Sequence, residues 1–127
     1  MTIQKILIVD DSPTERYFLS DILIKNGFSV STAISGEDAL LKIKADRPEL
    51  ILMDVVMPGQ NGYQVTRQIA RDPSTQDVPV IICTSKGQET DRIWGLRQGA
   101  RDYIVKPVDP GELLAKITAI SSAASHE

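Results

Sequence analysis

The sequence has 127 residues, of which 42% are hydrophobic and 24% are charged, a size and balance typical of one globular domain with a hydrophobic core. The formal net charge of −3 argues against nucleic acid or an anionic membrane as the main partner, because both select for a basic surface. The apolar runs, such as residues 6–9 and 80–83, are far too short to span a membrane, and we expect no signal peptide because residues 6–9 lead directly into Asp10.

A single cysteine, Cys83, excludes an internal disulfide and is typical of a reducing cytoplasm, where we expect this protein to be located. We interpret Cys83 as a small core residue and not as a redox centre. We expect one domain over residues 1–121, followed by a short polar tail at residues 122–127 that frays.

Short β-branched runs alternate with longer segments of helical periodicity along the chain. Strands are predicted at residues 5–9, 29–33, 50–53, 80–83 and 102–105. The first, third and fourth of these are almost wholly apolar, which is typical of strands covered on both faces of a parallel sheet.

A helix is predicted after each of these strands, and several have clear start signals. Ser12, Pro13 and Glu15 form a capping-box pattern before the first helix, and Asp109 begins the last in a similar way. The apolar residues at helical spacing are Phe18, Leu19, Ile22 and Leu23, then Ala39, Leu40 and Ile43, then Val65 and Ile69, then Ile93 and Leu96, and finally Leu113, Leu114, Ile117 and Ile120.

The order of elements is therefore a strand and a helix, repeated five times. Parallel strands need right-handed helical crossovers, which place helices on both faces of one open sheet. We predict an α/β fold, a doubly wound (βα)5 flavodoxin-like sandwich with parallel sheet order 2-1-3-4-5. In this architecture ligands bind at the carboxyl ends of the strands, beside the switch point between strands 1 and 3.

Acidic residues end the two strands at that switch point. Strand 1 runs into Asp10 and Asp11, and strand 3 runs into Asp54. Three carboxylates so close would raise one another's pKa, so a cation is needed to keep them ionised. Oxygen ligands without a His or Cys cluster favour Mg²⁺. With Thr84 and Lys106 at the ends of strands 4 and 5, the set predicts a phosphoryl-transfer site with an aspartate nucleophile.

Four short motifs carry a family resemblance. They are "ILIVDDS", "LILMDVVMPGQNG", "VPVIICTS" and "DYIVKPV". On these the chain, over about residues 3 to 121, resembles the response-regulator receiver domain of two-component signalling, of which the chemotaxis protein CheY is the single-domain type. The resemblance implies phosphorylation of Asp54, Mg²⁺ held by Asp10, Asp11, Asp54 and the backbone carbonyl of Val56, and phosphoryl contacts from Thr84 and Lys106.

The resemblance also implies a switch and its partners. The Lys106–Pro107 bond would be cis, and the ring of Tyr103 would move inward as Thr84 moves toward the phosphoryl group. A histidine kinase or its phosphohistidine domain would donate the phosphoryl group. An effector protein would bind the face of helix 4, strand 5 and helix 5. Residues 53–108 are most similar to stand-alone receivers of type IV pilus twitching motility, with chemotaxis-like behaviour as the neighbouring possibility.

Two other classes of protein would need residues that this sequence lacks. A haloacid-dehalogenase-like phosphohydrolase would need an acid/base aspartate where Val56 stands, and a flavin-binding module would need a phosphate loop where Asp10 and Asp11 stand. A receiver that only drains phosphoryl groups from a sibling stays open. Val56 cannot hydrogen-bond an attacking water, so we expect no fast hydrolysis and no enzyme activity beyond self-catalysed phosphotransfer and dephosphorylation. Trp94 is equally compatible with the core and with a partner surface.

Overall fold

The computed structural model describes residues 3–124 of the chain. Within them the strands are β1 (Lys5–Val9), β2 (Ser29–Ala33), β3 (Leu50–Met53), β4 (Val80–Thr84) and β5 (Asp102–Val105). The helices are α1 (Pro13–Lys25), α2 (Gly36–Ala45), α3 (Gly62–Arg71), α4 (Glu89–Arg97) and α5 (Pro110–Ala124). Strands and helices alternate as the sequence pattern predicts.

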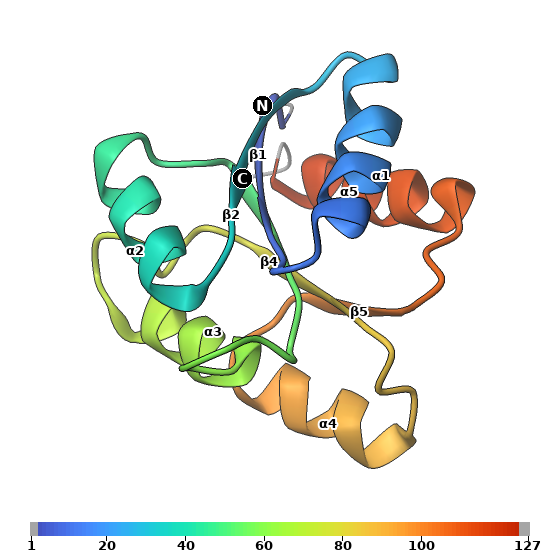
Figure 1. Ribbon diagram of the computed structural model, residues 1–127. Helices are drawn as coiled ribbons and strands as arrows, with labels where there is room; N and C mark the ends of the chain where they lie inside the picture. The colour runs from blue at the N-terminus through green and yellow to red at the C-terminus, as the bar shows by residue number, and fades with distance from the viewer. Residues whose placement is uncertain (1–2, 125–127) are drawn as a thin grey trace.

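The sheet order is β2-β1-β3-β4-β5, and every neighbouring pair is parallel. This confirms the predicted doubly wound, flavodoxin-like fold. Helices α1 and α5 cover one face of the sheet, and α2, α3 and α4 cover the other (Figure 1). Because each connection between strands crosses over through a helix, the carboxyl ends of all the strands lie at one edge of the sheet.

The central strands explain the stability of this arrangement. All residues of β3 and β4, and all of β1 except Lys5, are buried. Their Ile, Leu and Val side chains pack against helices on both faces, and each fully buried one contributes roughly 1.5–3 kcal/mol. Strand β2 lies at the edge and alternates between exposed and half-buried residues before Ala33.

Two predicted apolar faces are only partly buried. Phe18 of α1 is 39% exposed, and Ile93 and Leu96 of α4 are 44% and 37% exposed. The buried residue of α4 is Gly95. A Cβ atom there would lie 2.9 Å from Ile82 Cδ1 and 3.1 Å from the ring of Tyr103. The missing side chain lets α4 lie close to the sheet on its glycine face, which leaves Ile93 and Leu96 at the surface.

The last helix extends past the expected end of the domain. It continues through Ala124, so the domain boundary expected at residue 121 falls inside the helix, and residues 122–124 are helical. The backbone N–H of Ile3 donates to Ser121 Oγ at 2.8 Å, which holds the final turns against the start of the chain. The remainder of the expected tail, residues 125–127, lies outside the described residues.

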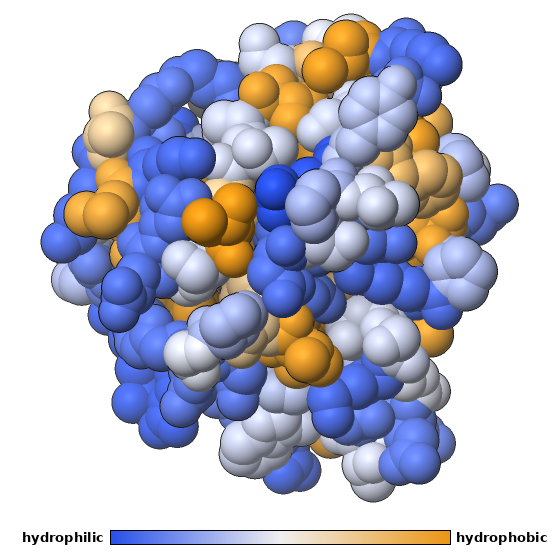
Figure 2. Space-filling model, viewed as in Figure 1, coloured by the Kyte–Doolittle hydropathy of each residue, from blue (hydrophilic) through white to orange (hydrophobic). Residues whose placement is uncertain are grey.

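The surface is mixed in character. Figure 2 shows hydrophilic residues over much of one face, with hydrophobic residues in separate patches. Between residues 3 and 124, no helix combines the length and the apolar character needed to cross a membrane.

Candidate functional site

The register of the sheet brings the acidic strand ends together. Val9 of β1 pairs with Met53 of β3, so Asp10 and Asp54 follow neighbouring positions. The backbone N–H of Asp54 donates to Val9 O at 2.9 Å, which fixes the strand end. One carboxylate oxygen each from Asp10, Asp11 and Asp54 lie within 4.8 Å of one another. The predicted convergence of these three residues at the β1–β3 edge is therefore present.

The chain after Asp54 is packed tightly against the site. Gly59 has φ +76°, a left-handed conformation that favours glycine in the turn. Asn61 caps helix α3 in a complete capping box with Gln64. A Cβ atom on Gly62 would lie 2.0 Å from the backbone oxygen of Asp54. Only glycine therefore allows the first turn of α3 to lie directly against the backbone of Asp54.

Lys106 is the cation beside the carboxylates. Its Nζ lies 2.8 Å from Asp10 Oδ2 and 3.5 Å from Asp54 Oδ1. Burial lowers the pKa of Lys106, but its hydrogen bond to Asp10 and the nearby negative charges outweigh burial and raise the pKa overall. The ammonium group therefore stays charged and neutralises part of the cluster.

Asp54 has the opposite balance. It is 7% exposed, and burial, followed by the charge of Asp10, raises its pKa to about 6 against the pull of Lys106. One lysine is thus not enough to offset the cost of a buried carboxylate beside another. A further positive charge at this point would favour the ionised form of Asp54.

The donor set fits a magnesium ion. Three carboxylates from adjacent strand ends offer only oxygen ligands, and Asp11 is exposed to solvent while Asp10 is buried. Mg²⁺ is held by one or a few carboxylates and keeps several waters, which an exposed edge permits. Asp10, Asp11 and Asp54 would hold the ion. The backbone carbonyl of Val56 as a further ligand stays a prediction.

The capping-box prediction at α1 is only half right. Ser12 Oγ accepts the backbone N–H of Glu15 at 3.3 Å, as expected. The N–H of Ser12, however, donates to Asp10 Oδ1 at 2.9 Å, so it is not available to Glu15. The Glu15 carboxylate instead lies 3.8 Å from Lys106 Nζ. Sequence reasoning missed this role, because a glutamate at the third helical position already has a local interpretation.

Thr84 and Tyr103 lie along β4 and β5 beside the site. Thr84 is fully buried, and its Oγ1 accepts only a long 3.4 Å hydrogen bond from the N–H of Lys86. The ring of Tyr103 is already inward and 4% exposed, and its hydroxyl donates to Lys86 O at 2.7 Å. Burial, and then the hydrogen bond with Tyr63, raise the pKa of Tyr103.

Tyr63 is a residue that sequence reasoning missed. Its hydroxyl lies 3.2 Å from the hydroxyl of Tyr103 and donates to Asp91 O at 3.1 Å. One side chain of α3 thus contacts both the inward tyrosine and helix α4. A tyrosine early in α3 gives no signal of this in the sequence, because the contact depends on how α3 and α4 pack beside each other.

The remaining predicted residues have clear positions. The Lys106–Pro107 peptide bond is cis, as expected. Val56 is 58% exposed. Cys83 is buried, and burial raises the pKa of its thiol to about 12, which agrees with a core residue. Trp94 is 50% exposed, which argues against a core position; its place in a partner surface stays a prediction.

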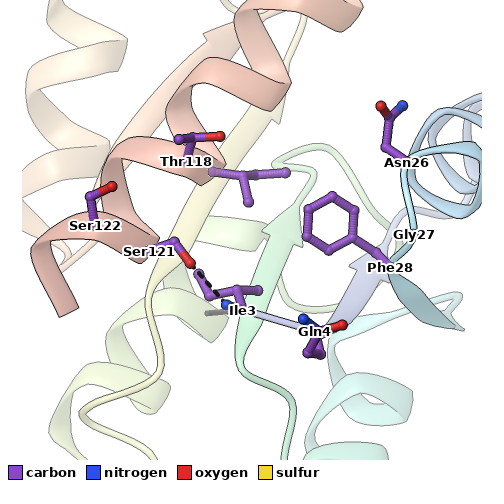
Figure 3. A pocket seen from close by; sticks show the side chains of 9 residues that line it. Ile3, Gln4, Asn26, Gly27, Phe28, Thr118, Ser121 and Ser122 are labelled. Carbon is purple, nitrogen blue, oxygen red and sulfur yellow. Dashed lines mark hydrogen bonds between the residues drawn. The ribbon is translucent and has the colours of Figure 1, made fainter. Parts of the chain in front are cut away.

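A separate cavity lies at the opposite edge of the sheet. Its volume is about 340 Å³, and it is formed by the two residues before β1, the turn between α1 and β2, and the end of α5 (Figure 3). The side chains around it include Phe28, Thr118 and Ser121, and none of the lining residues is titratable. The candidate site for phosphoryl chemistry is therefore the cluster of Asp10, Asp11 and Asp54 and not this cavity.

Residues 6–118 match the family model of the response regulator receiver domain. The chain therefore belongs to the response regulator receiver family. Receivers of this family act as signalling switches that work with histidine kinases and downstream effectors, and in general they are not enzymes in the usual sense.

Several proteins of this family are similar over most of their length. Protein PilH of Pseudomonas aeruginosa is 53% identical over 116 residues, which cover 91% of this chain and 96% of PilH. Chemotaxis protein CheY4 of Vibrio cholerae is 30% identical with a TM-score of 0.86, over 93% of this chain and 98% of that one. A chain of the Borrelia burgdorferi CheX–CheY complex, solved with BeF3 and Mg²⁺, is 29% identical with a TM-score of 0.85, over 92% of this chain and 88% of that one. This chain spans about half the length of several other curated relatives, between 46% and 51%.

Proposed function

We propose that this chain takes a phosphoryl group onto Asp54 from a histidine kinase or its phosphohistidine domain, with Mg²⁺ bound, and passes its state to an effector protein. The convergence of Asp10, Asp11 and Asp54 oxygens within 4.8 Å carries the proposal. Membership of the receiver family supports the class of reaction.

The transfer can be written from the residues present. An oxygen of the Asp54 carboxylate attacks phosphorus, and a P–O bond forms as the P–N bond to the donor imidazole breaks. The imidazole nitrogen leaves with the electron pair of that bond. Mg²⁺, when bound, supplies positive charge that keeps Asp54 ionised and offsets charge on the phosphoryl oxygens. Lys106, 3.5 Å from Asp54, is placed to pair with another phosphoryl oxygen.

We assign the switch to Thr84 and Tyr103. The buried hydroxyl of Thr84 makes one long hydrogen bond, so it is free to donate to a phosphoryl oxygen. Its movement would favour the inward ring of Tyr103, which this structure shows. The exposed apolar side chains of Ile93, Leu96 and Val105 support an effector surface formed by α4, β5 and α5.

We assign the pathway to control of type IV pilus twitching motility in the cytoplasm, with chemotaxis-like behaviour as the alternative. The 53% identity to PilH supports the first, and the CheY neighbours support the second. Turnover of outside substrates is not part of the proposal. The apolar, 58% exposed side chain of Val56 has no group to position a water, so we expect no fast hydrolysis of the acyl phosphate.

Intact-mass spectrometry after incubation with acetyl phosphate and Mg²⁺ tests the transfer. Wild type should gain one phosphoryl group, EDTA should prevent this, and Asp54→Asn should gain none. Asp46→Asn is a matched control, because Asp46 is an exposed partner of Lys5; it should react like wild type. An equal adduct on Asp54→Asn, or no metal-dependent adduct on wild type, contradicts the proposal.

Complementation tests the pathway. In a strain of the source organism that lacks this gene, the wild-type gene should restore normal twitching zones and the Asp54→Asn gene should not. Normal twitching in the deletion strain would contradict the assignment to pili. Full rescue by Asp54→Asn would contradict a phosphorylation-dependent role, whether the chain signals or drains phosphoryl groups.

A further inference from the structure

A basic groove lies between α3 and α4, separate from the carboxylate cluster. Its volume is about 370 Å³, and its charged lining consists of Arg67 and Arg71 from α3 and Arg97 from α4, beside Trp94. The other lining residues are Ala70, Gln98 and Gly99, so no carboxylate lines the groove. Three like charges thus face one hollow without an acidic neighbour in its wall.

These arginines are unpaired although the chain is acidic overall. Among residues 3–124, Arg67, Arg71 and Arg97 make no side-chain ion pair or hydrogen bond. The ion pairs in this range all use lysines, namely Lys5, Lys25, Lys42, Lys106 and Lys116. In a chain of net charge −3, the groove thus gathers three exposed guanidinium groups that are accessible to an outside anionic group.

The basic surface is longer than a single small anion requires. Arg67 and Arg71 lie one helical turn apart, and both also line an adjoining hollow of about 640 Å³ with Gln60, Gln64 and Gln68. Asp72 is at the end of this hollow, but Oδ1 of its carboxylate accepts the N–H and hydroxyl of Ser74 at 2.9 and 2.8 Å. A surface with guanidinium groups in one hollow and glutamine amides in the next can bind an extended segment that carries several polar groups.

The walls of the groove are held in place and carry strong binding side chains. The Tyr63 hydroxyl donates to Asp91 O at 3.1 Å, which ties α3 to α4. Trp94 is 50% exposed. Tryptophan and arginine are the residues most enriched at binding hot spots, and the planar guanidinium group binds carboxylates through two parallel hydrogen bonds.

We propose that this groove binds an acidic segment of a partner protein. Its Asp or Glu side chains pair with Arg67, Arg71 and Arg97, and its backbone packs over Trp94. This surface is distinct from the α4–β5–α5 face. Nucleic acid is a poorer match, because a polyanion longer than the groove would meet the acidic remainder of the chain.

A hexaglutamate peptide with a fluorescein label is a suitable probe for the full chain. Anisotropy should show saturable binding that weakens with added salt, and a hexalysine peptide should not bind. Trp94 is the only tryptophan, so its fluorescence should change in parallel with unlabelled peptide. The double variant Arg67→Ala/Arg97→Ala should bind roughly fivefold to twentyfold more weakly, as expected for two partly exposed ion pairs.

The matched control is Arg47→Ala/Arg92→Ala, which removes the same charge from exposed positions outside the groove. It should bind within about twofold of wild type, and circular dichroism should show that both double variants are folded. Absence of saturable binding, or equal weakening in the two double variants, overturns the proposal. Tighter binding of a thymidine hexanucleotide than of hexaglutamate overturns the acidic protein segment as the occupant.

Discussion

Replacing Asp54 by Asn should stabilise the fold at neutral pH when divalent cations are absent. The pKa of Asp54 in the folded chain is about 6, against an ordinary value of 3.8. A raised pKa means that the folded state holds the proton more tightly than the unfolded state does. The resulting stability is fully present below about pH 4 and is lost as the pH rises through about 6.

The size of the effect follows from the shift. About two pKa units at about 1.4 kcal/mol each give a cost of about 3 kcal/mol for the ionised carboxylate at about pH 8. Asparagine has no charge to bury, so the variant avoids this cost. The difference in the free energy of unfolding between Asp54→Asn and wild type should fall to about half at about pH 5. It should be less than about 1 kcal/mol near pH 4, where wild-type Asp54 is protonated.

Urea unfolding in EDTA at these pH values measures this difference in the free energy of unfolding. Asp21→Asn is the control, because Asp21 is a partly exposed partner of Lys25 on α1, and its effect should stay within about 1 kcal/mol at every pH. A gap between wild type and Asp54→Asn that does not change with pH would refute the reasoning. So would a variant that is less stable than wild type at about pH 8.

Three further outcomes are expected. Millimolar Mg²⁺ should raise the Tm of wild type at neutral pH and raise it much less in Asp11→Asn, since tenfold weaker binding removes about 1.4 kcal/mol; equal rises would exclude Asp11 as a ligand. Tyr103→Phe loses a 2.7 Å hydrogen bond to a backbone carbonyl and should lower the free energy of unfolding by about 1–2 kcal/mol. Tyr17→Phe, at a position 76% exposed, should change little by comparison, and equal losses would contradict the argument. Gly62→Ala places a Cβ atom 2.0 Å from Asp54 O and should cost about 3 kcal/mol or more in chemical denaturation; a variant as stable as wild type would show that α3 does not press on the site.

Much of the fold could be predicted because local and global signals agree. Residues 50–53 form an apolar run too short for a helix, and Asp54 directly after it marks the strand end. Asp10 and Asp11 end another such run. Once the strand order is known, the parallel register alone brings these carboxylates together.

Lateral packing could not be predicted in the same way. Helical periodicity selects Ile93 and Leu96 as the inward face of α4, but the close approach at Gly95 orients the helix differently. Tyr63 and the arginines of the groove depend on that same placement of α4 beside α3. Glu15 shows a second reason, since Asp10 takes the backbone N–H that a capping glutamate would have used.

The absence of a side chain at Gly62 has a mechanical consequence. The hydroxyl oxygen of the next residue, Tyr63, lies 3.2 Å from the hydroxyl oxygen of Tyr103. The same first turn of α3 therefore lies against the backbone of Asp54 at Gly62 and contacts the hydroxyl of Tyr103 through Tyr63. A single methyl group added at Gly62 would overlap the Asp54 carbonyl, so little free space separates this turn from the site. We expect that a change at the Asp54 backbone would reach Tyr103 through this turn of α3 as well as through the proposed movement of Thr84.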